Sequence, residues 1–279
     1  MDLVLALVTG LAAGLHCSTW GMYKDSPHEG FGWGKYFRSA IIGLIYGPIV
    51  YNIVGFDLNT GGGIVLLFGS VYLCERLTLE VWKTFLRSED QSKYFIPMQL
   101  SVFGKPIESQ RTRYIAAVVY VGAIVLLGWV IWQLYQAYLA GSVNVNPYLI
   151  LVLLSVGGWI SAFGGAWKDA PLEGFETFKF FRSPSVSYTY AFLAANLTDN
   201  FVIITLCSIG FTIASIETYK TFFFPSRPRG KFSGKPILFP DMLKKRHYFV
   251  PVYIAIWLYV IINAVVAFIE PHQGLVNPF

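Results

Sequence analysis

The chain is poor in charged residues and in cysteine. Only 13% of its 279 residues are Asp, Glu, Lys or Arg, whereas 55% are hydrophobic. Soluble domains carry about 25% charged residues, so this chain has roughly half the usual number of groups that solvate a protein surface. No polar stretch is long enough to form a separate soluble domain. These shortages argue against a soluble protein and predict an integral membrane protein, because lipid accepts apolar surface that water does not.

The three cysteines (Cys17, Cys74 and Cys207) all fall inside apolar runs. Their odd number and their spacing argue against a disulfide framework and a metal site. We expect them to be small apolar side chains within helices. The N-terminus also lacks the basic region of a signal peptide, so residues 2–22 are expected to form a retained first span.

Long apolar segments recur along the whole chain. A membrane-spanning helix needs about 20 mostly apolar residues. Eight segments qualify: 2–22, 40–56, 63–82, 114–138, 148–167, 184–198, 200–219 and 248–269. The second and sixth are short and contain polar residues or proline, so we expect them to tilt, break or be shielded by neighbours. The predicted fold is an all-α integral membrane protein with about eight transmembrane helices.

Lys and Arg are missing from every second loop. The loops after the second, fourth and sixth segments contain neither residue, whereas the other loops are basic, the last one including Arg227 and Arg229. The positive-inside rule therefore places the basic loops in the cytoplasm and both termini outside. We expect a bacterial or archaeal cytoplasmic membrane. The net charge of +5 then requires no nucleic-acid partner, since basic cytoplasmic loops account for it.

An eight-residue motif occurs twice. Lys-Asp-Ser-Pro-His-Glu-Gly-Phe at 24–31 matches Lys-Asp-Ala-Pro-Leu-Glu-Gly-Phe at 168–175. Further matches follow in the same order: 37–39 with 181–183, 80–85 with 217–222, and 104–107 with 234–237. Ordered self-similarity of this kind indicates an internal duplication. It predicts two four-helix repeats, residues 1–140 and 141–279.

The predicted repeats are parallel. Each contains four spans, an even number, so both insert in the same orientation and are related by a pseudo-twofold axis along the membrane normal. Both motif copies then face the cytoplasm. The sequence leaves open whether they form one site or two.

The acidic residues of the motif have two interpretations. Asp25, Glu29, Asp169 and Glu173 are candidate catalytic or metal-binding residues. Acidic residues four apart share one helix face, so each pair is suited to holding Mg²⁺ or to acting as an acid–base pair.

The interpretation that we favour is a helix start. Ser26 would be the N-cap, Pro27 the first helical residue and Glu29 the closing residue of a capping box. In the second copy Ala170 replaces the serine, yet both acids remain, and Asp169 would have to cap instead.

Basic residues near the motifs form a second candidate set. They are Lys24, Arg38, Lys105, Lys168, Arg182 and Lys235. The simpler expectation is that they anchor lipid head groups, and the alternative is a specific phosphate site, for which Arg offers a bidentate donor and Lys a point charge. Glu75 and Arg76 lie inside the third span without counterparts in the second copy. Because charges within a span are costly, they form a candidate intramembrane polar site.

Three functions fit these features. We favour a protein that binds or processes a phosphorylated or otherwise anionic lipid-like substrate at the cytoplasmic interface. The alternatives are a transporter or channel built on the two repeats, and an accessory subunit of a membrane complex or oligomer. The expected partners are membrane lipids with anionic head groups. Mg²⁺ is the cofactor that the acidic pairs would suit, and whether the protein is an enzyme stays open.

Overall fold

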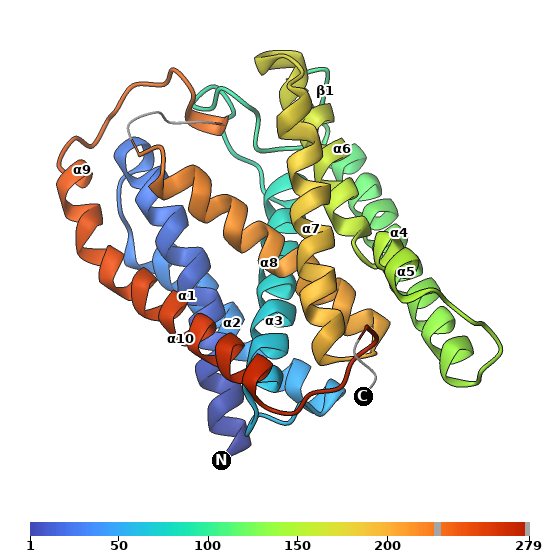
Figure 1. Ribbon diagram of the computed structural model, residues 1–279. Helices are drawn as coiled ribbons and strands as arrows, with labels where there is room; N and C mark the ends of the chain where they lie inside the picture. The colour runs from blue at the N-terminus through green and yellow to red at the C-terminus, as the bar shows by residue number, and fades with distance from the viewer. Residues whose placement is uncertain (226–229, 277–279) are drawn as a thin grey trace. The chain divides into compact units, whose positions relative to one another are not determined.

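The computed structural model describes residues 1–225 and 230–276 and is built of helices. The long helices are α1 (Asp2–Glu29), α2 (Trp33–Val54), α3 (Gly61–Val81), α4 (Gln110–Leu139), α6 (Val156–Glu173), α7 (Thr177–Leu197), α8 (Phe201–Phe222) and α10 (Val250–Ile269) (Figure 1). Shorter helical segments are α5 (Pro147–Leu154), α9 (Met242–Lys245), η1 (Trp82–Leu86), η2 (Gly230–Phe232) and η3 (Arg246–Phe249). The all-α prediction is confirmed, and the strands β1 (Ser101–Val102) and β2 (Lys105–Pro106) form only a short antiparallel hairpin in a loop.

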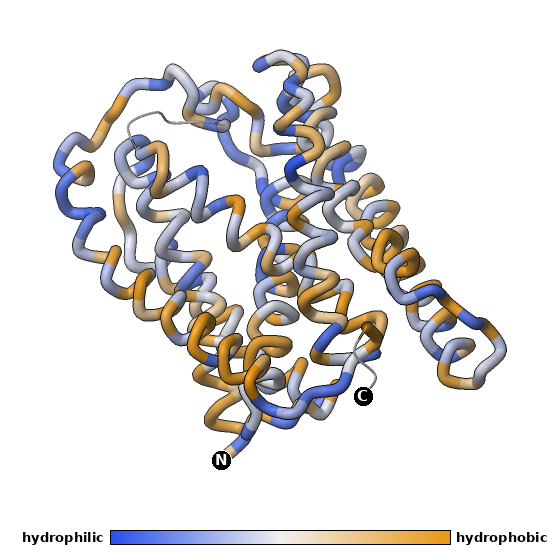
Figure 2. The backbone as a smooth tube through the Cα atoms, viewed as in Figure 1, coloured by the Kyte–Doolittle hydropathy of each residue, from blue (hydrophilic) through white to orange (hydrophobic). Residues whose placement is uncertain are grey.

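Six helical stretches in the described part of the chain are long and apolar enough to cross a membrane. They are Asp2–Glu29, Trp33–Val54, Gln110–Leu139, Pro147–Glu173, Phe201–Phe222 and Met242–Ile269. The other two predicted spans correspond to α3 and α7, which are helical but not among these six. In Figure 2, α10 is coloured predominantly hydrophobic, whereas the segment that leads into it is predominantly hydrophilic. The composition and length of the helices indicate an integral membrane protein.

The chain forms two compact units, each of which is discontinuous in sequence. Unit 1 comprises Met1–Arg76 and Gly210–Gln273, and unit 2 comprises Leu77–Ile209 and Gly274–Pro278. Each unit therefore takes segments from both predicted halves of the chain. The predicted division at residue 140 concerns the sequence repeat and stays a prediction.

In unit 1, α1 and α2 pack with their backbones in contact. A Cβ atom at Gly14 would overlap the carbonyl oxygen of Ser39, and one at Gly43 would overlap the carbonyl oxygen of Gly10. Gly47 meets the carbonyl of Ala6 in the same way. Small residues spaced four apart on both helices allow this approach, which is typical of helix pairs in membranes.

In unit 2, α6 and α7 make a similar close contact. Gly158 faces the carbonyl oxygen of Ser183 and the backbone of Pro184, so a side chain at Gly158 would collide with them. The predicted fifth span is interrupted at Ser155, where the backbone leaves the α-helical region between α5 and α6. The span limits also need correction, because α1 continues to Glu29 and α2 begins at Trp33. Arg227 and Arg229, used for the charge prediction, lie outside the described residues.

Candidate functional site

The motif forms the end of a helix, not its start. Pro27 lies within the last turn of α1, which ends at Glu29, and the N–H of Gly30 donates to the carbonyl of Ser26 at 2.9 Å. Gly30 has φ of 74°, a conformation that glycine adopts without a Cβ penalty. The prediction of a helix N-terminus with Ser26 as cap is therefore wrong.

The second copy of the motif has the same local structure. Pro171 lies inside α6, which ends at Glu173, and Gly174 has φ of 84°. Its N–H donates to the carbonyl of Ala170 at 2.9 Å. Asp169 is thus not an N-cap. In both copies the glycine of the Gly-Phe pair that follows the acidic residues marks the helix C-terminus. The interpretation as a capping box did not take this signal into account.

A buried arginine compensates for the proline in the first copy. Pro27 has no N–H, so the carbonyl of Tyr23, four residues earlier, loses its helical hydrogen bond. Arg246 donates from Nη1 to this carbonyl at 3.1 Å, and its guanidinium also lies 4.3 Å from the Tyr23 ring centroid. The carbonyl of Pro27 accepts the N–H groups of Leu238 and Phe239 at 3.0 and 2.9 Å. The end of α1 is therefore held by residues more than 200 positions away.

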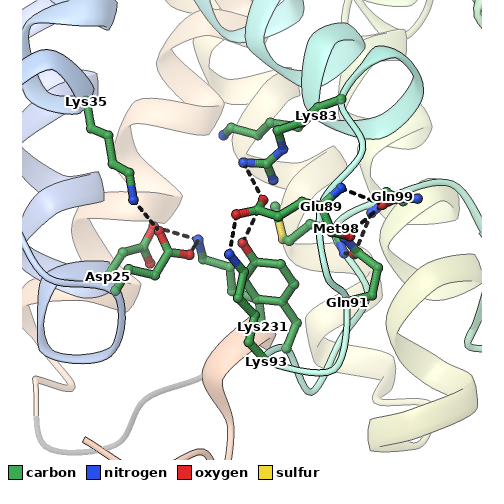
Figure 3. A network of polar contacts seen from close by, with 12 residues as sticks. Asp25, Lys35, Lys83, Glu89, Gln91, Lys93, Met98, Gln99 and Lys231 are labelled. Carbon is green, nitrogen blue, oxygen red and sulfur yellow. Dashed lines mark hydrogen bonds and ion pairs between the residues drawn. The ribbon is translucent and has the colours of Figure 1, made fainter. Parts of the chain in front are cut away.

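The acidic pair of the first motif is bound by lysine. Lys231 lies 2.9 Å from Asp25 Oδ2 and 3.2 Å from Glu29 Oε1, and Lys35 lies 3.7 Å from Glu29 Oε2. Figure 3 shows Lys35 and Lys231 directed toward the acidic side chains of α1. Two carboxylates on one helix face thus share one ammonium group, as their spacing of four residues allows.

The acidic pair of the second motif has a similar partner. Lys179 lies 3.3 Å from Asp169 Oδ2 and 2.7 Å from Glu173 Oε2. Burial alone would lower the pKa of Lys179, but the hydrogen bond that it donates to Glu173 and the charge of Asp169 hold this pKa above its ordinary value. Among the described residues there is no group of three or more His, Cys, Asp or Glu placed to hold a metal ion. In this structure each acidic pair forms ion pairs with a lysine side chain.

Both Gly-Lys-Pro segments pack against the end of a motif helix. In unit 1, the carbonyl of Pro236 lies 2.9 Å from His28 Nδ1, and Phe232 stacks on the His28 ring at 4.5 Å. In unit 2, Gly104 lies against the side chain of Leu172. His28 and Leu172 occupy the same position of the motif. Each motif helix is therefore covered by the segment that belongs to the other predicted half.

The other candidate cations lie near these helix ends. Arg38 and Arg182 are half-buried and stand six residues into α2 and α7, respectively. Lys105 is exposed in β2, Lys168 is half-buried on α6, and Lys235 is half-buried after η2. The structure thus divides the six predicted basic residues between the two units, three in each.

A half-buried ionic network in unit 1 contains Lys24. Its ammonium lies 3.3 Å from Glu217 Oε2, and Lys220 lies 3.1 Å from Glu217 Oε1. Lys24 and the guanidinium of Arg76 are each 5.2 Å from the ring centroid of Trp20. One aromatic ring therefore lies against two cations, an arrangement that a desolvated indole stabilises.

The network continues from Arg76 toward the middle of α1. Arg76 Nη1 lies 4.0 Å from Glu75 Oε2, and the Cys17 thiol lies within electrostatic reach of both charges. The indole N–H of Trp20 donates to the Tyr72 hydroxyl at 3.0 Å, and this hydroxyl lies 3.1 Å from His16 Nδ1. The result is a chain of polar groups from Lys220 to His16.

Two members of this chain have unsatisfied polar atoms. Glu75 and His16 are both 0% exposed. Within the described part of the protein, no N–H or O–H group donates to either carboxylate oxygen of Glu75, which only the weakly donating Cys17 thiol approaches. The Nε2 atom of His16 has no hydrogen-bond partner there. Buried polar groups are normally paired, so such atoms call for a functional explanation.

Aromatic side chains enclose the inner end of the chain. The His16 ring stacks on Tyr253 at 4.3 Å and meets Trp257 and Phe68 edge-on at 5.2 and 6.3 Å. The hydroxyl of Tyr253 is hydrogen-bonded to Thr218. His16 is thereby fixed in orientation at the middle of α1.

The polar chain reaches only half of the length of α1. His16 stands 13 residues before Glu29 and 14 after Asp2, so it lies about 20 Å from the motif end at 1.5 Å per residue. Toward the other end, the next buried polar side chain on α1 is that of Thr9, which pairs with the Tyr259 hydroxyl at 2.7 Å. Between them α1 buries Gly10, Ala13 and Gly14. The polar network therefore extends from the motif end of α1 to its middle and does not continue to the other end.

The aligned positions in the second half of the sequence carry few of these polar residues. An offset of 144 residues, which aligns the motif, places Ile160, Ser161 and Gly164 where α1 has His16, Cys17 and Trp20. The offset of 137, which aligns Glu80 with Glu217, places Thr212 and Ile213 against Glu75 and Arg76. The pairs Glu80–Lys83 and Glu217–Lys220 do recur, at 3.9 and 3.1 Å. The polar chain is thus specific to unit 1.

Unit 2 contains a different polar cluster, in the loop after η1. Glu89 forms ion pairs with Arg87 at 2.7 Å and with Lys93, and Gln91 donates to Gln99 at 2.9 Å (Figure 3). Burial alone would raise the pKa of Glu89, but the hydrogen bond from Lys93 and the charge of Arg87 outweigh it and hold the pKa below its ordinary value. This cluster stabilises a loop, and nothing in it resembles the unit 1 network.

No family model, curated protein or solved structure matches this chain. Function is therefore argued from its own residues.

Sequence reasoning found Glu75, Arg76 and Lys24 but missed their partners. His16, Trp20 and Lys24 are spaced four apart in the first span, which places them on one helix face. That spacing, together with the acid and base inside the third span, was the available signal. The pairing of Lys24 with Glu217 depends on a tertiary contact and had no signal of its own.

Proposed function

We propose that this membrane protein binds the anionic head group of a lipid-like substrate at a one-sided site within unit 1. The observation that carries the proposal is the polar chain from Lys220 to His16, which starts near the motif and ends at the middle of α1. A channel would need polar groups along the whole membrane thickness, whereas a head-group site needs them from one side only.

The charge of the network favours an anionic group. Lys24, Arg76 and Lys220 supply three cations, and Glu75 and Glu217 supply two carboxylates. One positive charge is in excess in a poorly solvated setting, where an uncompensated charge is expensive. A phosphate group beside Arg76 and Lys24 would offset it and would gain charge-assisted hydrogen bonds.

The proposal includes an origin by duplication with exchanged elements. Supporting it, several contacts occur once in each unit at matching positions. The ring pair Phe222–Tyr253 lies in unit 1 at 4.4 Å, and Phe85–Tyr120 lies in unit 2 at 5.4 Å. The helix contacts at Gly14 and Gly158 follow the same offset as the motif. In this view both units have the same helix contacts, and only unit 1 has the polar residues of the proposed site.

Sidedness follows from the loop charges. The motif ends of α1 and α6 adjoin the basic segments, so the proposal places the entrance of the site on the cytoplasmic side and the termini outside. Substrate would then arrive from the inner leaflet. Labelling of single cysteines introduced at positions 31 and 59 would test this orientation, because Asn59 is exposed in the loop after α2 and position 31 is expected to be shielded in intact cells.

The test of the function is lipid retention with a charge-neutral variant. Lys24→Gln combined with Glu217→Gln removes the entrance pair and leaves the net charge of the protein unchanged. We expect this variant to lose about tenfold or more in affinity for phosphatidylglycerol over phosphatidylcholine in native mass spectrometry, because a charge-assisted hydrogen bond is worth about 1.5 to 3 kcal/mol.

The second half of the chain supplies the matched control. Lys168→Gln with Glu80→Gln alters the equivalent positions of the repeat, and this variant should retain wild-type lipid preference. Equal losses in both variants, or no loss in either, would contradict a site in unit 1.

A transporter is the second candidate, and Glu75 is the observation that favours it. A buried carboxylate deep in a helix is typical of a substrate or ion pathway. Flux of a polar solute into proteoliposomes that stops in Glu75→Gln would support transport. Head-group binding without any flux would support the first proposal.

A further inference from the structure

We propose that Glu75 receives a hydrogen-bond-donating group of the same head group, a hydroxyl or an ammonium. This inference rests on the proposed head-group site and adds the class of substrate. The head group would therefore be a phosphodiester whose substituent carries a hydroxyl or ammonium donor, not one whose substituent is apolar.

The first observation is the state of the Glu75 side chain. It is fully buried, and no N–H or O–H group of the described residues donates to either of its oxygens; the nearby Cys17 thiol is only a weak donor. An ionised carboxylate accepts hydrogen bonds and cannot donate them. The group that satisfies it must therefore bring N–H or O–H bonds, which excludes a second phosphate or carboxylate.

The second observation is the position of Glu75 relative to the cations. Arg76 Nη1 lies 4.0 Å from Glu75 Oε2. Lys24 and Arg76 both lie 5.2 Å from the Trp20 ring centroid, so the two cations are at most about twice that distance apart. A phosphate held by these cations places a donor two or three bonds further along within reach of the carboxylate. Ethanolamine and glycerol head groups have this length.

The third observation is the asymmetry of the chain. The aligned position in the second half is Thr212, a neutral residue on α8, although the Glu217–Lys220 pair nearer the end of that helix corresponds to the Glu80–Lys83 pair after Glu75. The interfacial pair therefore occurs without the deeper carboxylate. A carboxylate at this position is thus not required for packing the helices. Ligand binding would explain why Glu75 is present despite the cost of burying its charge.

Two pairs of lipids with equal chains test the inference. Phosphatidylglycerol and phosphatidylmethanol have the same charge, but only the first carries hydroxyl donors on its substituent. Phosphatidylethanolamine and phosphatidylcholine differ in the same way, because only the first has N–H bonds. We expect the wild-type protein in native mass spectrometry to prefer the donor member of at least one pair by about tenfold, as a hydrogen bond to a charged group provides.

The variant Glu75→Gln separates the two donor classes. Gln keeps the size and an acceptor oxygen but loses the charge, so a preference for ethanolamine should disappear, whereas a preference for glycerol should fall by less. Glu75→Ala should abolish either preference. Glu80→Gln, on the same helix, is the matched control and should leave both ratios unchanged.

The outcomes distinguish this inference from the function on which it rests. If anionic lipids bind in a way that depends on Lys24 and Glu217, but neither lipid pair is discriminated, the inference about Glu75 is wrong and the head-group site stands. The same holds if discrimination survives in Glu75→Ala. If no lipid of the four depends on Lys24 and Glu217, both are wrong.

Discussion

The proline of the first motif predicts a specific energetic coupling with Arg246. In the native protein Arg246 supplies the hydrogen bond that the Tyr23 carbonyl lacks because residue 27 is proline. Arg246→Gln should therefore leave a buried carbonyl unsatisfied and lower the free energy of unfolding by about 1.5 to 3 kcal/mol, the range for hydrogen bonds from charged donors.

The same substitution should cost much less in a Pro27→Ala background. Alanine has an N–H that can bond to the Tyr23 carbonyl within the helix, so Arg246 is no longer needed for that purpose. The contact of the guanidinium with the Tyr23 ring is lost equally in both backgrounds and cancels in a double-mutant cycle. We expect a coupling energy of about 1 to 2 kcal/mol, measured by reversible SDS unfolding in mixed micelles.

The second motif provides the control for this cycle. Arg113 is a buried arginine in the first turn of α4, but it donates to the Arg87 carbonyl and to Ser88 Oγ, both at 2.7 Å. Arg113→Gln should therefore cost the same with and without Pro171→Ala. If the Arg246→Gln cost is also unchanged by Pro27→Ala, the reasoning about the freed carbonyl is refuted.

Three further predictions concern the scaffold. Gly14→Ala should destabilise the protein by about 2 kcal/mol or more because its Cβ would meet backbone, whereas Gly21→Ala, which faces open space on the same helix, should be neutral or stabilising by up to about 1 kcal/mol in SDS unfolding. Because its folded pKa is depressed, Glu89 should stabilise the protein above the ordinary carboxyl pKa of about 4.3 and lose this effect as pH falls further; the melting-temperature difference between wild type and Glu89→Gln should therefore shrink from pH 6 to pH 3, and a constant difference would contradict the ion-pair role. Since each compact unit contains segments of both halves, fragments 1–140 and 141–279 should fold only when co-expressed, and a protease-resistant single fragment would contradict this.

Much of the fold was accessible from local sequence. The apolar segments predicted the helices because burial in lipid requires a long apolar run, and each predicted span is largely helical, the fifth as two helices. Element limits were less accessible. Lys24 and Asp25 were expected between helices and Glu29 at the start of a new one, yet all three extend α1, since their charges are balanced by Glu217 and Lys231.

The motif shows why local rules failed at the site. Ser-Pro-x-Glu is typical of a helix start. Gly30, directly after Glu29, is typical of a helix end, and the two signals compete at this motif. The deciding interactions come from Arg246 and from the backbone of Leu238 and Phe239, which lie far away in sequence. Sequence periodicity carries no information about such partners.

The buried network was visible only in part. Glu75 and Arg76 were identifiable because a charge inside a span is expensive wherever its partner lies. Tyr72 and His16 were not, because aromatic residues and a single histidine within an apolar helix usually serve packing. Their joint position depends on how α1 and α3 pack within unit 1.

The most direct test of the central claim is an electron cryo-microscopy structure of the protein in nanodiscs of phosphatidylglycerol and phosphatidylcholine. The account predicts head-group density in unit 1 beside Lys24 and Arg76, extending toward Glu75, and its loss in the Lys24→Gln/Glu217→Gln variant. A map that resolves these side chains with no head group among them, or with one bound at Lys168 in unit 2 instead, would contradict it.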